Sequence, residues 1–325
     1  MPIPEYAVVT NRLTKRFGDL VAVDRIDLQV PAGSVVSLLG PNGAGKTTVV
    51  RMLATLTEPT SGTAVVCGHD VTREADAVRS LISLTGQFAA LEGNLTAKEN
   101  LVLMARLRGY DRRTALRVVD RLIDRFDIGE FRDKLVKSVS GGQRRRADLA
   151  ASLVCQPKLL VLDEPTTGLD PRSRQTVWAT VRELIAEGVT VLLTTQYLEE
   201  ADELADHVVL IDHGRAVATG TPAQLKAQIG DQRVDVVAVD VAGYELLVAQ
   251  LSGRFRLTTA PERRMISIPA PGETSDLRAV TEIVAASGVP VDEVALRRPT
   301  LDDAFLALTS VSGPDIGDTV AEVLA

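Results

Sequence analysis

Residues 35–53, VVSLLGPNGAGKTTVVRML, contain the strongest sequence signal for the fold of this chain. It opens with an apolar run, passes through a glycine-rich loop, and ends with apolar residues at helical spacing. The loop fits the pattern G-x-x-x-x-G-K-[ST], with Gly40, Gly45, Lys46 and Thr47 at the fixed positions. A strand before this pattern and a helix after it predict a phosphate-binding loop in an α/β domain.

The chemistry of phosphate binding explains these residue types. Glycines let backbone N–H groups approach the phosphates, Lys46 neutralises the β and γ oxygens, and the Thr47 hydroxyl binds Mg²⁺. The helix that begins here adds a favourable dipole. The alternative is a glycine-rich turn that precedes Lys-Thr by chance, and the surrounding strand and helix count against it. The expected ATP contacts are Gly40, Pro41, Asn42, Gly43, Ala44, Gly45, Lys46, Thr47 and Thr48.

A second apolar run, KLLVLDEP at residues 158–165, ends in two carboxylates. We predict that Asp163 holds Mg²⁺ and that Glu164 accepts the proton of an attacking water. An acidic turn at the end of a strand is the alternative.

Upstream, the segment VSGGQ places Ser140, Gly141, Gly142 and Gln143 before a helical run. A Ser-Gly-Gly helix entry is a second anion-binding nest, because free N–H groups and a hydroxyl meet there without Cβ obstruction. The chain thus has two phosphate-binding elements, whereas one γ-phosphate needs only one of them and the metal ion. We therefore expect two chains to pack head to tail, each lending residues 140–143 to the ATP of the other. The arginines at 144–146 either flank phosphates or form a solvated helix face.

The bulk composition is that of an ordinary globular protein. Of the 325 residues, 45% are apolar and 24% charged, with a net charge of −7, which argues against binding nucleic acid through bulk charge. Cys67 and Cys155 lie far apart in apolar contexts and are expected to be reduced thiols. No stretch reaches the roughly 18–20 apolar residues of a membrane span, and the start lacks a secretory signal pattern. We expect a cytoplasmic chain whose membrane role depends on a separate partner.

The pattern along the chain predicts two parts. Strand-like and helix-like segments alternate up to about residue 225, which implies a mainly parallel sheet with covered faces. Beyond Gly230 the pattern suggests a small α+β unit with two or three strands and a helix. The segment TLDDAFLALT reads as a closing helix, with Thr300 as its N-cap and Asp303 in its first turn.

These motifs, in this order and spacing, resemble the nucleotide-binding subunits of ABC transporters over about residues 7–225. The resemblance implies a P-loop NTPase fold with a mainly parallel core sheet, an N-terminal antiparallel β part and a helical subdomain. It also implies an ATP-binding domain at residues 7–228, with the helical subdomain at about 94–150. A small α+β accessory or regulatory domain at 230–312 and a flexible tail at 313–325 would follow. The segment ALRRPTLDDAFLALT and Gln196 are similar to the daunorubicin-resistance ATPase subfamily.

The resemblance assigns further roles to single residues. Phe17 would stack on adenine, with a place in the ordinary core as the alternative. Gln87 would reach Mg²⁺ and the attacking water, and it begins the segment that faces the membrane partner in the family. Asp170, which ends GLD, would lie at the dimer interface.

The segment after Gln87 also contains candidate partner contacts. Phe88, Leu91 and Leu95 form either a groove for a short helix of the partner or part of the local core.

Gln196 stands where the broader family usually has histidine. Because an amide cannot titrate, we expect Gln196 to hydrogen-bond the γ-phosphate or its water, which leaves Glu164 as the base. A plain polar strand end is the alternative. The predicted catalytic set is therefore Glu164, Gln196 and Gln87.

The resemblance implies an ATPase that binds MgATP, dimerises around two ATPs and powers efflux of drug-like or lipophilic compounds through a separate permease. Two other classes stay open: a ribosome- or DNA-associated ATPase, and an ATP-dependent assembly factor for the permease. The single cassette and acidic charge argue against the former, and the intact base and magnesium residues argue against the latter.

Overall fold

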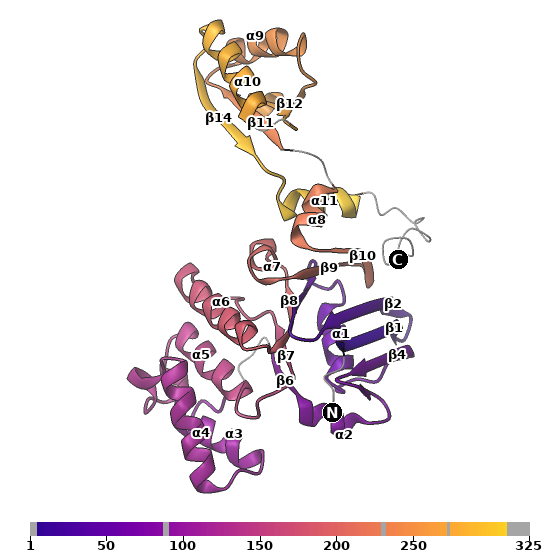
Figure 1. The fold of residues 1–325 in the computed structure, drawn as a ribbon, viewed down its shortest axis with the longest axis vertical. Coiled ribbons are helices and arrows are strands. Elements are labelled where there is room, and N and C mark those ends of the chain that lie inside the picture. The colour runs from indigo at the N-terminus through magenta and orange to yellow at the C-terminus, as the bar shows by residue number, and fades with distance from the viewer. Residues whose placement is uncertain (1–4, 87–90, 229–231, 272–273, 311–325) are drawn as a thin grey trace. The chain divides into compact units, whose positions relative to one another are not determined.

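The computed structural model describes residues 5–86, 91–228, 232–271 and 274–310 of the chain. The chain divides into two compact units, Met1–Pro222 and Ala223–Ala325, which we call unit 1 and unit 2 (Figure 1). The hydrophobic cores of the two units share no residues.

A six-stranded sheet forms the centre of unit 1, in the order β10-β9-β3-β8-β7-β6. Neighbouring strands are parallel except β9 and β10, which pair antiparallel. The strands are β3 (Val35–Leu39), β6 (Ile82–Thr85), β7 (Leu159–Asp163), β8 (Thr190–Thr195), β9 (His207–Asp212) and β10 (Arg215–Gly220). The expected mainly parallel sheet is confirmed.

A second, antiparallel sheet of unit 1 has the order β2-β1-β4-β5. Its strands are β1 (Tyr6–Phe17), β2 (Leu20–Pro31), β4 (Ser61–Val66) and β5 (His69–Asp70). This is the N-terminal antiparallel part that the family resemblance implied.

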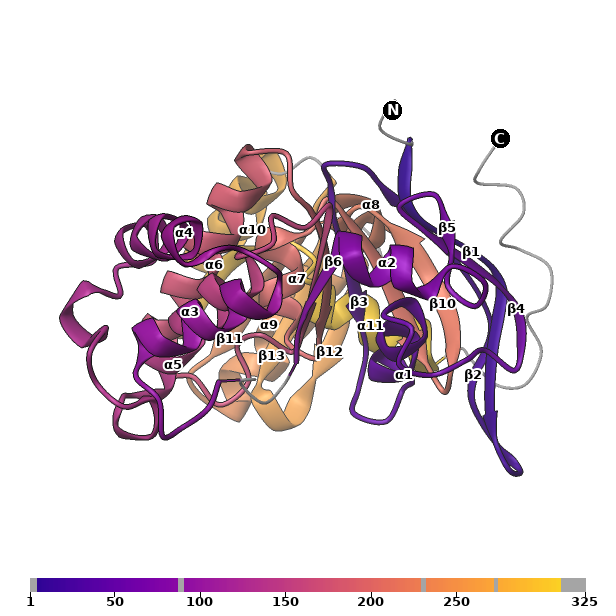
Figure 2. The same cartoon turned by 90° about the horizontal axis from the view of Figure 1, so that it is seen from below.

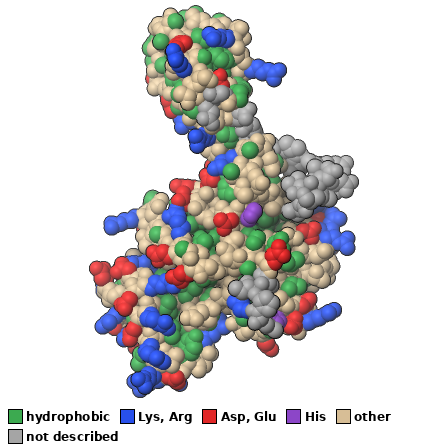
Figure 3. All heavy atoms as spheres, viewed as in Figure 1, with side chains coloured by type: hydrophobic (Ala, Val, Ile, Leu, Met, Phe, Trp, Pro, Cys, Tyr) green, Lys and Arg blue, Asp and Glu red, His purple; other side chains and the backbone are tan. Residues whose placement is uncertain are grey.

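The described helices of unit 1 lie on both sides of the central sheet, as Figure 2 shows. They are α1 (Lys46–Leu53), α2 (Ala75–Leu81), α3 (Ala97–Leu107), α4 (Arg112–Arg125), α5 (Gly141–Ser152), α6 (Pro171–Ala186) and α7 (Leu198–Leu204). Figure 3 shows Lys and Arg side chains gathered over the end of unit 1 that holds α3 and α4, with Asp and Glu side chains between them.

Two hydrophobic cores lie on opposite faces of the central sheet. Because successive strand residues point to opposite faces, Leu160 and Leu162 of β7 join the core under α3 to α6, whereas Leu159 and Val161 join the core under α1. Helices α1 and α5 therefore cover different faces. Both faces of the strands are buried, which explains their continuous apolar sequences.

Unit 2 is an α+β domain with the element order β-α-β-β-α-β. It contains β11 (Arg233–Ala238), α9 (Val241–Ser252), β12 (Thr258–Ala260), β13 (Met265–Pro269), α10 (Thr274–Ser287) and β14 (Val291–Arg297). The sheet order β12-β13-β11-β14 is that of the ferredoxin-like split βαβ motif. The expectation of two or three strands and one helix is wrong, because this sheet has four strands and α9 was not predicted.

Two short helices, α8 (Pro222–Ala227) and α11 (Leu301–Ser310), flank the sheet domain in sequence. The predicted cap of α11 is confirmed, since the Thr300 hydroxyl accepts from the Asp303 N–H at 3.2 Å. Across the described part of the chain, none of the helices is both long and apolar enough to cross a membrane.

Candidate active site

The phosphate loop runs from the end of β3 to the start of α1 and is tightly packed against neighbouring backbone. A Cβ on Gly40 would lie 2.1 Å from the carbonyl oxygen of Ile211, and one on Gly45 would lie 2.5 Å from that of Ala22. Gly45 also has a φ of 109°, which side chains disfavour. Both positions therefore require glycine, and α1 begins without a side-chain cap, so its first N–H groups are available to an anion.

Lys46, the first residue of α1, is nearly fully buried inside this loop. Its Nζ donates to the carbonyl oxygens of Gly40 (2.7 Å) and Pro41 (2.9 Å) and lies 3.8 Å from Oε1 of Glu164. Burial lowers the pKa of Lys46, and the neighbouring carboxylates Glu164 and Asp163 oppose that shift. The ammonium group is thus held close to both the loop and the acidic strand end.

Asp163, the last residue of β7, receives two hydroxyl hydrogen bonds on the same oxygen. Thr47 Oγ1 donates to Asp163 Oδ1 at 3.2 Å, and Thr194 Oγ1 donates to it at 2.5 Å. Asp163 is 7% exposed. Strands β3, β7 and β8 end at the same edge of the sheet, which brings residues from three distant segments together.

Glu164 leaves the strand in a left-handed backbone conformation, with a φ of 51°. Its N–H is bound by the carbonyl oxygen of Thr194 at 3.0 Å, and its Oε2 accepts from the hydroxyl of Thr167 at 3.2 Å. A non-glycine residue in this region is strained by about 1–2 kcal/mol. Such strain is concentrated at functional sites, where the surroundings hold it in place.

The two predicted glutamines have different outcomes. Gln196 directly follows β8 and is half-buried at the same sheet edge as Asp163. Gln87 and Phe88 lie outside the described residues, and the nearest described residue before them, Gly86, accepts from Arg145 Nη1 at 2.9 Å.

Ser140 caps α5 and begins the second predicted anion site. Its Oγ accepts from the Gln143 N–H at 3.2 Å, and Gln143 Oε1 accepts from the Ser140 N–H at 3.1 Å. Within the described ranges, no hydrogen bond or ion pair joins residues 140–143 to the phosphate loop. The chain brings together Lys46, Thr47, Asp163 and Glu164, but residues 140–143 are not part of that cluster.

The start of α6 packs against the Ser140 segment. A Cβ on Gly142 would lie 2.5 Å from the hydroxyl of Ser173. Asp170 caps α6, since its Oδ1 accepts from the Ser173 N–H at 3.0 Å and its Oδ2 from the Ser173 hydroxyl at 2.6 Å. These hydrogen bonds lower the pKa of Asp170. Asp170 thus has a capping role whatever else it contacts.

Phe17 ends β1 and is 53% exposed, with Lys15 Nζ 5.1 Å from its ring centroid. The alternative that it belongs to the ordinary core is therefore wrong, and its ring is accessible for stacking.

A buried polar network beside the site was not predicted. Glu200 of α7 is fully buried and accepts from Trp178 Nε1 at 3.0 Å, while Arg145 of α5 pairs with Asp148 at 3.2 Å. Arg145 is 7% exposed, so the prediction that it flanks phosphates or lies on a solvated helix face is wrong. Its neighbours in the arginine run, Arg144 and Arg146, are more exposed. No spacing pattern distinguishes Arg145 from them.

Comparison with known proteins identifies close relatives. A family model described as ABC transporter matches residues 23–167. Daunorubicin resistance ATP-binding protein DrrA3 of Streptomyces coeruleorubidus is 48% identical over 305 residues, which cover 93% of this chain and 96% of that protein. Daunorubicin/doxorubicin resistance ATP-binding protein DrrA of Streptomyces peucetius is 48% identical over 316 residues, with coverages of 96% and 95%.

Solved structures show the same fold. The structure of cbiO1 from Clostridium perfringens, described as part of the ABC transporter complex cbiONQ, matches with a TM-score of 0.64 and 26% identity. It covers 69% of this chain and 92% of its own.

Proposed function

This chain belongs to the ATP-binding subunits of ABC transporters, in the group of daunorubicin-resistance ATP-binding proteins, and we propose that it powers export of drug-like compounds through a separate permease. As a member of that family it binds ATP and hydrolyses it. The observation that carries the ATPase part of the proposal is the sheet edge, where Thr47 is hydrogen-bonded to Asp163 and Lys46 is paired with Glu164.

Glu164 is the proposed base for hydrolysis. It follows the buried strand β7 and has its backbone held by Thr194, so its carboxylate has a defined position. Lys46 binds the β and γ oxygens of the nucleotide. These contacts replace its hydrogen bonds to the carbonyl oxygens of Gly40 and Pro41. Gln196 donates a hydrogen bond to the γ-phosphate or the attacking water, because its amide cannot take a proton from either.

Thr47 and Asp163 fit a magnesium ion that comes with the nucleotide. Both offer hard oxygen donors, and these lie 3.2 Å apart. Mg²⁺ usually takes one or two protein oxygens and completes its shell with phosphate oxygens and water. When bound, it would neutralise charge on the β- and γ-phosphates.

A head-to-tail dimer would complete each ATP site with Ser140, Gly141, Gly142 and Gln143 of the other copy. Helix α5 and helix α1 cover opposite faces of the central sheet, which favours a partner's α5 over the chain's own. The Ser140 hydroxyl accepts from a backbone N–H and keeps its own hydrogen for a phosphate oxygen. Phe17 stacks on the adenine, and Asp170 lies at the dimer interface.

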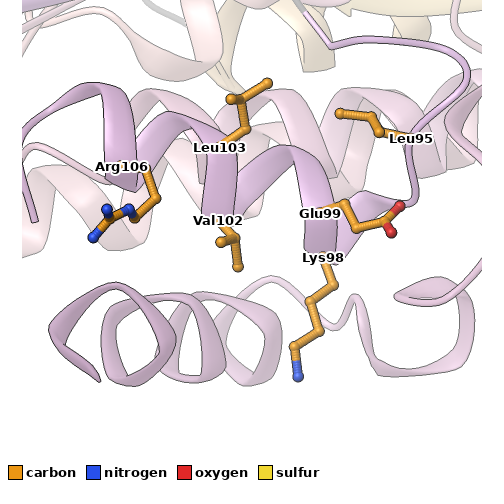
Figure 4. A pocket seen from close by; sticks show the side chains of 6 residues that line it. All are labelled: Leu95, Lys98, Glu99, Val102, Leu103 and Arg106. Atoms are coloured by element: carbon orange, nitrogen blue, oxygen red, sulfur yellow. The ribbon is translucent and has the colours of Figure 1, made fainter. Parts of the chain in front are cut away.

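A shallow groove on α3 is the proposed contact with the permease. It has a volume of about 460 Å³ and is lined by Leu95, Lys98, Glu99, Val102, Leu103 and Arg106. Figure 4 shows that all but Leu95 come from α3. An apolar floor with charged margins suits a short amphipathic helix of a partner. Of the two described residues of the predicted groove, Leu95 lines this one and Leu91 packs against the core, while Phe88 lies outside the described residues.

The substrate class comes from the relatives, whose names give resistance to daunorubicin or doxorubicin. We expect the membrane partner, rather than this chain, to select the substrate. We therefore propose lipophilic, drug-like compounds as a class, and the cytoplasmic face of the membrane as the place of action.

Substitution of Glu164 by Gln tests the proposal. We expect the purified complex of the variant with its permease to lose ATP turnover by about 10²- to 10⁴-fold, the usual contribution of a general base. Binding of a fluorescent ATP analogue should persist. Cells that express the permease with wild-type chain should retain less of a fluorescent anthracycline than cells that express it with the variant.

Hydrolysis by Glu164→Gln at the wild-type rate would show that another residue is the base. Equal drug retention in the two strains would contradict export. Stimulation of wild-type ATPase by ribosomes or DNA, but not by the permease, would favour the ribosome- or DNA-associated class instead.

A further inference from the structure

Thr194 lies at the junction of the two acidic residues of the site. It is the register partner of Asp163 between the parallel strands β7 and β8, and it is fully buried. Its Oγ1 donates to Asp163 Oδ1 at 2.5 Å and accepts from the Glu164 N–H at 3.1 Å. One hydroxyl thus contacts both carboxylate residues without being exposed to a ligand itself.

The orientation of this hydroxyl is determined by its partners. A threonine hydroxyl has one hydrogen and two lone pairs. Since the Glu164 N–H occupies a lone pair, the hydrogen is directed at Asp163. A hydrogen bond to a carboxylate is charge-assisted and therefore short and strong, in keeping with the observed distance.

The same hydroxyl also supports the unusual backbone of Glu164. The N–H of Glu164 is shared between the carbonyl oxygen of Thr194 at 3.0 Å and its Oγ1 at 3.1 Å. With a φ of 51°, Glu164 needs such restraint to remain in the left-handed region. This turn sends the carboxylate to within 3.8 Å of Lys46 Nζ.

We propose that Thr194 is a positioning residue of the ATPase, whose hydroxyl orients Asp163 beside Thr47 for Mg²⁺ and holds Glu164 in place as the base. This inference rests on the proposed function, because it assumes that Asp163 and Thr47 hold the ion. Ligands of a metal are commonly oriented by such indirect partners, whose loss typically weakens metal affinity or activity by about 10- to 100-fold.

The same strand supplies a matched control. Thr190 is also a buried threonine of β8, and its Oγ1 accepts from the Gly33 N–H at 2.9 Å at the opposite end of the strand. If Thr194 were only a satisfied strand hydroxyl like Thr190, loss of either hydroxyl would change stability alone.

Thr194→Val removes the hydroxyl and keeps the shape and β-branching of the side chain. We would measure binding of a fluorescent ATP analogue in EDTA and across a Mg²⁺ titration, followed by kcat and KM of the ATPase. We expect the affinity of Thr194→Val for the ATP analogue in EDTA to equal that of the wild type. The Mg²⁺ concentration that gives half of the Mg²⁺-dependent change in binding should rise by about 10-fold or more, and kcat should fall by about 10- to 100-fold. Thr194→Ser, which keeps the hydroxyl, should have the wild-type Mg²⁺ titration and the wild-type kcat. Thr190→Val should match the wild-type Mg²⁺ titration.

A normal Mg²⁺ titration and kcat in Thr194→Val would overturn the inference while leaving the proposed function intact. So would an equal Mg²⁺ shift in Thr190→Val. Should the valine variant fail to fold, Thr194→Ala carries the same expectation. If nucleotide binding and turnover of the wild-type chain did not depend on Mg²⁺, the proposed magnesium site would be wrong, and the role of Thr194 with it.

Discussion

Gln196 follows directly after the two buried threonines that end β8. An amide there can donate and accept hydrogen bonds at any pH, so it can contact a phosphate but cannot move a proton. A hydrogen bond to a charged group contributes about 1.5–3 kcal/mol, which is enough to sense the γ-phosphate.

Gln196→His should therefore keep substantial ATP hydrolysis, since the imidazole N–H can make the same contact. The measurement is steady-state ATPase beside nucleotide affinity. A variant that binds ATP normally but is fully inactive would argue against a simple sensing role.

Glu200 is a carboxyl group that is fully buried in the core next to the site. Burial raises its pKa above the ordinary value of 4.5. The folded state therefore binds the proton more tightly than the unfolded state, and stability falls as pH rises from about 4.5 to the raised pKa. Glu200→Gln removes this titration and keeps an oxygen that can accept from Trp178.

We expect urea unfolding to show a flatter decline of stability with pH above 4.5 for Glu200→Gln than for the wild type. The variant should also be at least as stable as the wild type at pH 8. Parallel pH profiles for the two proteins would mean that Glu200 titrates alike in the folded and unfolded states.

Residues with local signals could be predicted, and those that act through tertiary contacts could not. The roles of Lys46 and Thr47 could be predicted from one contiguous pattern, because the loop and the helix dipole that bind a phosphate are both local. Thr194 meets Asp163 only through the register of two strands that are distant in sequence. Arg145 lies in a run of three arginines, and helical rotation alone decides which of them is buried.

Helix α5 begins with Ser140, which caps the helix and which we propose also binds a phosphate of the other copy. Ser140 and Gln143 form a capping box, which satisfies two of the N–H groups at the helix start. The remaining N–H groups and the helix dipole favour an anion at the same place. Aspartate caps a helix about as well as serine but carries a charge, so Ser140→Asp should preserve α5 while repelling a phosphate.

Helix α9 shows where the sequence pattern misleads. Asp240 is a good N-cap, and its Oδ1 accepts from the Gly243 N–H at 2.7 Å. Gly243, however, is a poor helix former, and it is present because a Cβ would lie 2.7 Å from Val289. The glycine in α9 is thus explained by tertiary packing, which helix propensity does not take into account.

The whole chain divides into two units with separate hydrophobic cores. Unit 2 has its own apolar core beneath α9 and α10, and the two resistance proteins match nearly the whole chain rather than unit 1 alone. We propose that unit 2 is an accessory or regulatory domain. We expect its role to be separable from ATP chemistry, because the clustered site residues all lie in unit 1.

We propose that two copies complete each other's ATP sites through Ser140 and the glycines after it. The most direct measurement is the mass of the Glu164→Gln variant in solution with MgATP, by light scattering. We predict the 34.8 kDa monomer with ADP, twice that mass with ATP, and no ATP-dependent dimer when Ser140→Asp is added. A monomer under all conditions, or a dimer that Ser140→Asp leaves intact, would show that Ser140 does not complete the ATP site of a second copy.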